Sequence, residues 1–135
     1  MAEAIWAERL GKLHGGKVTV ESAGIAALVG KPADPLAVEL MTERGLELSR
    51  HRARQLSPEL AMRAELILVM EEGHRRAVEQ MIPMARGRVH RLGRWGNFDV
   101  PDPYRHPRAA FEEALGLIDR GLADFEKAFF ATVGL

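Results

Sequence analysis

Five consecutive apolar residues, Leu66 to Met70, constrain the fold more than any other stretch of the chain. A short continuous run of this kind is typical of a strand that is buried on both faces of a parallel sheet. Residues 88–92 predict another strand, and residues 18–22 alternate as a short strand would. Parallel strands cannot be joined by tight turns, so we expect helices between them.

The remaining segments carry the expected helical patterns. Ile5, Trp6 and Leu10 have helical spacing, and Gly15 with Gly16 is predicted to end that helix. Asp34-Pro35 and Ser57-Pro58 each resemble an N-cap followed by the first helical residue, and residues 71–81 suit a further helix. The last helix has the clearest apolar stripe. It consists of Phe111, Leu115, Ile118, Leu122, Phe125 and Phe129.

The composition fits one α/β domain over residues 1–135 and excludes several functions. Lys plus Arg equals Asp plus Glu at 19 each, so no charge excess indicates nucleic acid or an anionic membrane as a partner. No run is long enough to span a bilayer, and no secretory signal is visible. A cytoplasmic location is the default expectation. The chain has no cysteine, which excludes disulfides, thiolate metal sites and a cysteine nucleophile of its own.

Five stretches taken together, in this order, resemble the low-molecular-weight protein-tyrosine phosphatases. They are Val20–Gly24, Gly30–Pro35, Gly45–Gln55, Leu66–Met70 and Pro101–Arg105. The likeness is strongest to the bacterial branch that acts with tyrosine autokinases in exopolysaccharide or capsule export. It implies a three-layer sandwich of the phosphotyrosine phosphatase I type, with helices on both sides of a parallel sheet.

The resemblance also implies that the front of the domain is missing. The family begins with a strand and a phosphate loop of the form Cys-x5-Arg-Ser-Pro, followed by a helix whose start resembles Met1–Ala4. The central strand, the nucleophilic cysteine and the phosphate-binding arginine would then lie upstream of Met1. An internal methionine taken as the start explains this, and a natural truncation is the alternative. We expect the 135-residue chain to be inactive, and to be unstable, to aggregate or to dimerise.

The family's general acid corresponds to Asp102, which lies between two prolines. By resemblance, this group protonates the leaving phenolate and then activates the water that releases phosphate. The tripeptide Pro-Asp-Pro taken alone favours a stiff turn, and the four other stretches favour the catalytic role. Tyr104 would stack on the substrate ring at the rim, and Leu28 would form a second recognition wall. Each of these two could instead be an ordinary loop contact.

Two further residues, Ser22 and His51, correspond to groups that support the phosphate loop through hydrogen bonds. Without that loop we expect both side chains to lack partners. The histidines show no ligand-like spacing, so no metal and no other cofactor is expected.

The resemblance therefore implies a phosphatase that forms a phosphocysteine on a phosphotyrosine protein, with a tyrosine autokinase as a candidate partner. A pseudophosphatase that only binds phosphoproteins is an alternative. An arsenate reductase relative is a third reading, and the absence of further cysteines argues against it.

Overall fold

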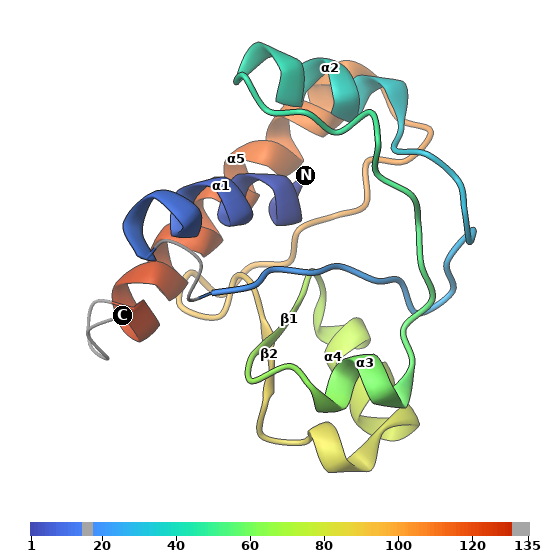
Figure 1. The fold of residues 1–135 in the computed structure, drawn as a ribbon, viewed down its shortest axis with the longest axis vertical. Coiled ribbons are helices and arrows are strands. Elements are labelled where there is room, and N and C mark those ends of the chain that lie inside the picture. Colours follow the sequence, from blue (N-terminus) through green and yellow to red (C-terminus); the bar gives the residue numbers. More distant parts are fainter. Residues whose placement is uncertain (15–17, 131–135) are drawn as a thin grey trace.

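A short parallel sheet lies between two groups of helices in the computed structural model, which describes residues 1–14 and 18–130 (Figure 1). The elements in chain order are α1 (Ala2–His14), α2 (Pro35–Glu43), α3 (Pro58–Met62), β1 (Ile67–Val69), α4 (Glu72–Met81), the 3₁₀ turn η2 (Pro83–Ala85), β2 (Val89–Arg91), α5 (Arg108–Phe125) and the π-helical turn η3 (Glu126–Phe130). No described helix is long and apolar enough to cross a membrane.

The predicted strands around Leu68 and His90 pair in parallel, in the register Ile67 with Val89 and Val69 with Arg91. Helix α4 forms the connection between them and packs on both strands. The predicted parallel sheet flanked by helices is confirmed.

The prediction of a third strand over residues 18–22 is wrong, because these residues form no strand in the described part of the chain. This segment crosses the molecule as a stretched chain in Figure 1, but it forms no ladder with β1 or β2. Alternation sets which side chains face inward, yet a strand also needs a paired neighbour, and the described sheet has only two strands. Backbone pairing with residues 52–56 begins only at Gly24, whose N–H donates to the Arg54 carbonyl at 2.9 Å.

Helix starts follow the predicted caps. Asp34 Oδ1 accepts a hydrogen bond from the Leu36 N–H at 2.9 Å, and Ser57 Oγ accepts from the Leu60 N–H at 3.2 Å. Each satisfies an N–H that would otherwise have no intrahelical partner. Helix α1 ends at His14, and the predicted terminators Gly15 and Gly16 lie outside the described residues.

The apolar stripe of α5 joins two of three buried clusters. Phe111 and Leu115 pack with α2, while Ile118, Leu122 and Phe125 pack with α1. The third cluster lies on the other side of the sheet, where α3, α4 and η2 meet Val69 and Val89. Phe129, predicted to continue the stripe, is 36% exposed in η3, so the buried part of the stripe ends at Phe125.

Candidate functional site

The loop between β2 and α5 carries Asp102, and it is fixed on both sides of that residue. Before it, the Val100 N–H donates to the Met70 carbonyl at 2.9 Å, and the Val100 side chain is buried. After it, Arg108 at the start of α5 donates to both carboxylate oxygens of Glu43 at 2.9 Å and to Glu112 at 2.9 Å. The loop is therefore attached to the carboxyl end of β1 and to α2.

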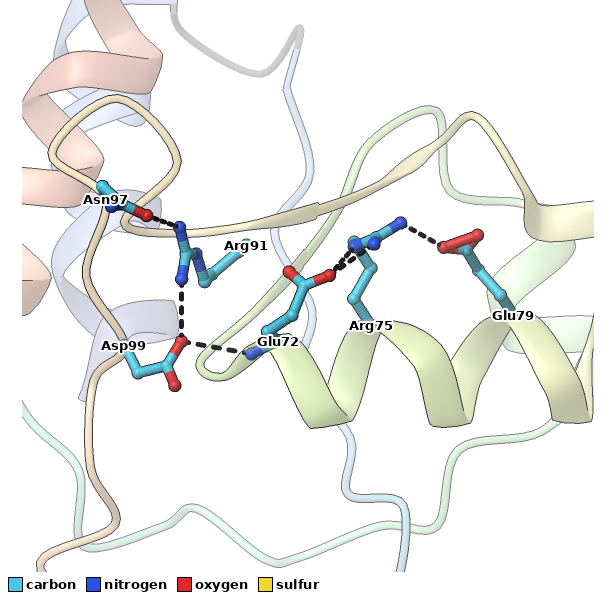
Figure 2. A network of polar contacts seen from close by, with 6 residues as sticks. All are labelled: Glu72, Arg75, Glu79, Arg91, Asn97 and Asp99. Carbon is cyan, nitrogen blue, oxygen red and sulfur yellow. Dashed lines mark hydrogen bonds and ion pairs between the residues drawn. The ribbon is translucent and has the colours of Figure 1, made fainter.

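A network of polar contacts fixes the first half of this loop (Figure 2). Arg91 on β2 donates to Asn97 at 2.8 Å and to Asp99 at 3.2 Å. The same Asp99 oxygen accepts a hydrogen bond from the Glu72 N–H at 3.1 Å, at the start of α4. Asn97 has a φ of 53°, a left-handed conformation that asparagine adopts more readily than most residues. The network joins the loop to a strand and to a helix.

The side chain of Glu72 takes part in a second set of contacts along α4. Arg75 donates to Glu72 on one side and to Glu79 at 2.6 Å on the other (Figure 2). The hydrogen bond from Arg75 lowers the pKa of the Glu72 carboxyl. Glu72 therefore binds Asp99 through its backbone and Arg75 through its side chain.

The carboxylate of Asp102 is exposed and is oriented by its own turn. Its Oδ1 accepts a hydrogen bond from the Tyr104 N–H at 3.0 Å. This is the contact expected of an Asx turn, in which an aspartate side chain binds the backbone two residues ahead. Oδ2 has no hydrogen bond to a described residue, so one oxygen is held while the other is open to a ligand or to water.

The side chain of Tyr104, two residues after Asp102, is 49% exposed. The Arg105 guanidinium lies 5.3 Å from the ring centroid, a cation–π distance. Arg105 itself has a φ of 66°, which is unfavourable for a residue with a long side chain. The guanidinium thus lies over one face of the tyrosine ring.

Leu28 is 61% exposed in the loop of residues 24–33. The base of this loop is firmly held, because the Gly30 N–H donates to Ala53 and the Ala53 N–H donates to Lys31, both at 2.8 Å. Neither a hydrogen bond nor a buried apolar cluster joins Leu28 to Tyr104 in the described part of the chain. The two predicted recognition residues are thus both accessible to a ligand.

The expectation that Ser22 would lack a partner is wrong. Its hydroxyl donates to Glu3 in the first turn of α1, and its carbonyl accepts from Arg54 Nε at 3.0 Å. Glu3 replaces the partner that we expected to be missing, since the first turn of α1 lies against the end of residues 18–22.

His51 is half-buried in the segment between α2 and α3, and its backbone N–H donates to the Leu48 carbonyl at 3.1 Å. Its carbonyl accepts from Arg52 at 2.7 Å. No contact joins His51 to Ser22 among the described residues, so each is placed by its own segment.

Sequence reasoning missed Arg91, Asp99 and Glu3. Asp99 lies only three positions before Asp102. Its carboxylate caps α4 from a separate loop, and a contact of this kind leaves no spacing pattern in the sequence. The sequence pattern places Arg91 in a strand and Glu3 in a helix start, and it carries no signal of the contacts that the two side chains make.

Comparison with known proteins settles the family. The family model described as "Low molecular weight phosphotyrosine protein phosphatase" matches residues 1–133. The chain is a member of this family of phosphatases.

Several relatives of this phosphatase chain are close over most of its length. EpsP of Ralstonia nicotianae, named as a low-molecular-weight protein-tyrosine phosphatase, is 50% identical over 105 residues, which are 78% of this chain and 72% of EpsP. Wzb of Escherichia coli K12, which has the same family name, is 41% identical over 126 residues, covering 93% of this chain and 86% of Wzb.

Among solved structures, Vibrio vulnificus Wzb in complex with benzylphosphonate is 40% identical. It superposes with a TM-score of 0.86 over 95% of this phosphatase chain and 88% of its own. The likeness confirms the predicted fold class, a parallel sheet with flanking helices, over the part of the chain that the superposition covers.

Proposed function

We propose that this chain, as a single domain, supplies the general acid and the substrate rim of a phosphatase that acts on phosphotyrosine in proteins. The supporting observation is the Asp102 carboxylate, one oxygen of which is held by the Tyr104 N–H while the other is open. A group that must first give a proton to the leaving phenolate and then take one from water needs both accessibility and a fixed direction. The anchored loop provides the direction.

Tyr104 and Leu28 are proposed to contact the substrate. An exposed tyrosine ring two residues after the acid can stack on the aromatic ring of phosphotyrosine. Vibrio vulnificus Wzb binds benzylphosphonate, which carries an aromatic ring and a phosphonate group, and this supports an aromatic phosphoester as the substrate class. Ser22 and His51 are proposed to support the phosphate-binding loop, with Glu3 as the partner of Ser22.

The nucleophile of the proposed reaction is a thiolate, and none of the 135 residues is a cysteine. A thiolate attacks phosphorus, the bond to the phenolate oxygen breaks, and water then releases phosphate from the phosphocysteine. We infer that these residues alone do not catalyse this reaction. The substrate is proposed to be a phosphotyrosine protein, with a tyrosine autokinase as the candidate.

An experiment that joins the missing chemistry to this chain tests the proposal. The chain is produced alone and also fused, at its amino end, to an apolar strand followed by a Cys-x5-Arg-Ser-Pro segment. We expect hydrolysis of an aryl phosphate by the fusion and none by the chain alone. Asp102→Asn in the fusion should lower kcat by about 10²–10⁴-fold, most strongly for esters whose phenol has a high pKa.

Asp124→Asn on α5 is the matched control, because it changes the same charge far along the chain without touching the loop. An Asp102→Asn fusion with unchanged kcat for all phenols, or equal effects of the two substitutions, would contradict the role of Asp102. Hydrolysis by the chain alone at the rate of the fusion would contradict the thiolate mechanism.

A further inference from the structure

A cavity of about 310 Å³ lies between α4 and β2, near the lower end of the size range of small-molecule sites. None of the residues proposed above to be catalytic or to contact substrate lines it. Four of its side chains are drawn in Figure 2, on α4 and on β2. The full lining consists of Glu72, Arg75, Glu79, Gly87, Val89, His90, Arg91 and Arg94.

The acidic side chains of this cavity are already occupied. Glu72 and Glu79 both accept hydrogen bonds from Arg75, at 2.8 Å and 2.6 Å (Figure 2). A metal ion would have to displace that guanidinium, and it would also meet the positive charges of Arg91 and Arg94. The lining therefore disfavours a cation.

The guanidinium of Arg94 carries the unbalanced charge of the cavity. Its Nη1 lies 3.2 Å from Nδ1 of His90, and its Cζ lies 5.3 Å from the ring centroid of Trp95. Neither neighbour supplies a negative charge, and Arg94 forms no ion pair with a carboxylate of the described residues. Because the residue is exposed, an anion can reach this charge from solvent and accept a charge-assisted hydrogen bond.

The outer edge of β2 adds two backbone donors. Residues of a parallel strand direct their backbone groups alternately to its two edges. Since His90 is aligned with Leu68 of β1, the N–H groups of Val89 and Arg91 lie on the edge that faces away from β1. Neither N–H donates to another residue in the described part of the chain. Free N–H groups at a sheet edge favour an anion as their acceptor.

We propose that this cavity, which we call the edge site, binds a phosphate group, either as inorganic phosphate or as a small phosphate monoester. Arg94 would donate from the solvent side, and the N–H groups of Val89 and Arg91 would donate from the strand. Donors that converge from several directions suit the tetrahedral oxygens of phosphate better than the planar oxygens of a carboxylate. The edge site is a second site, and it does not depend on the proposed function.

Arg91 belongs both to the edge site and to the network that holds the Asp102 loop (Figure 2). Its guanidinium donates to Asp99 at 3.2 Å and to Asn97 at 2.8 Å. An anion in the cavity therefore competes with Asp99 for the charge of Arg91. Because such coupling is reciprocal, weakening the contact with Asp99 should strengthen the binding of the anion.

The test measures the binding of inorganic phosphate to the 135-residue chain at pH 7.5 and constant ionic strength, by calorimetry and by the NMR shifts of backbone amides. We expect saturable binding with a Kd at or below about 1 mM. The largest shifts should occur at the amides of Val89 and Arg91, which would accept the anion directly.

Three substitutions assign the binding to the edge site. Arg94→Gln should raise the Kd about tenfold, because it removes a charge-assisted hydrogen bond. Arg76→Gln is the matched control, since Arg76 is an exposed arginine of α4 that does not line the cavity, and it should change the Kd by less than about twofold. Asp99→Asn should lower the Kd about two- to fivefold, because the competing charge is lost.

Other anions define the ligand. Acetate, a planar carboxylate, should bind at least about tenfold more weakly than phosphate. Methyl phosphate distinguishes the two sources of the phosphate group: binding as tight as that of inorganic phosphate identifies a monoester site, and much weaker binding identifies a site for the free ion.

Four results would each overturn the edge site. They are the absence of saturable binding, equal affinities for phosphate and acetate, equal effects of Arg94→Gln and Arg76→Gln, and shifts that spare Val89 and Arg91. An unchanged or higher Kd in Asp99→Asn would overturn the coupling to the loop. None of these measurements involves hydrolysis, so their outcome is independent of the proposed function.

Discussion

Asp99 provides the sharpest test of how the acid loop is held. Its carboxylate accepts from the first turn of α4 at 3.1 Å and from Arg91 at 3.2 Å. Asp99→Ala removes both contacts. A lost capping contact costs about 0.5–2 kcal/mol, and an ion pair at this level of exposure adds about 0.2–1 kcal/mol. We expect the free energy of unfolding to fall by about 1–2 kcal/mol.

The measurement is urea denaturation followed by circular dichroism, for which a pure stability change lowers the midpoint and leaves the slope unchanged. Asp99→Asn keeps an oxygen for the Glu72 N–H and loses only the charge, so it should recover more than half of the loss. Glu113→Ala on α5 is the control at an exposed position and should change stability by less than about 0.5 kcal/mol.

The reasoning would be refuted if Asp99→Ala and the Glu113→Ala control had the same effect on stability within error. It would also fail if Asp99→Asn were as damaging as Asp99→Ala, since the cap would then contribute nothing. In the active fusion, Asp99→Ala should lower kcat with little change in KM, because loop orientation is what the contact provides.

Two further predictions follow from particular side chains. On α5, Gly116→Ala should raise the free energy of unfolding by about 1 kcal/mol, since an added Cβ meets no atom within 4 Å. Gly121→Ala should lower it by about 1–2 kcal/mol net, because its Cβ would lie 2.9 Å from the Leu92 carbonyl oxygen. If urea melts showed both substitutions changing stability in the same direction, this prediction would be contradicted. Burial, and to a smaller extent the charge of Arg94, lowers the pKa of the His90 imidazole below its usual value of 6.5. As the pH drops below about 6.5, the unfolded state therefore takes up a proton before the folded state does, and the free energy of unfolding should fall. His90→Gln should flatten that dependence in melts at about pH 7.5 and 5.5, and an unchanged slope would count against it.

The sequence was a good guide wherever a pattern is local. The caps at Asp34 and Ser57 and the stripe on α5 follow from side chains within one or two turns, and the structure has them where they were predicted. Residues 18–22 show the limit, because alternation describes the faces of a strand and cannot supply its neighbour.

The candidate site divides along the same line. Asp102 and Tyr104 were found because their order in the chain resembles a family, and their turn is local. The sequence gives no signal for three residues whose contacts join different elements of the fold, namely Arg91, Asp99 and Glu3. No periodicity encodes a carboxylate that caps a helix from another loop.

The attachment of the acid loop at Val100 and at Arg108 leaves only the seven positions between them free to move. Three of those positions, at Pro101, Pro103 and Pro107, have a φ angle fixed by the proline ring. Such a segment loses little conformational entropy when a substrate arrives, because few alternatives are open to it beforehand. Mutations that lengthen or loosen this stretch should therefore slow turnover even when every side chain that touches the substrate is preserved.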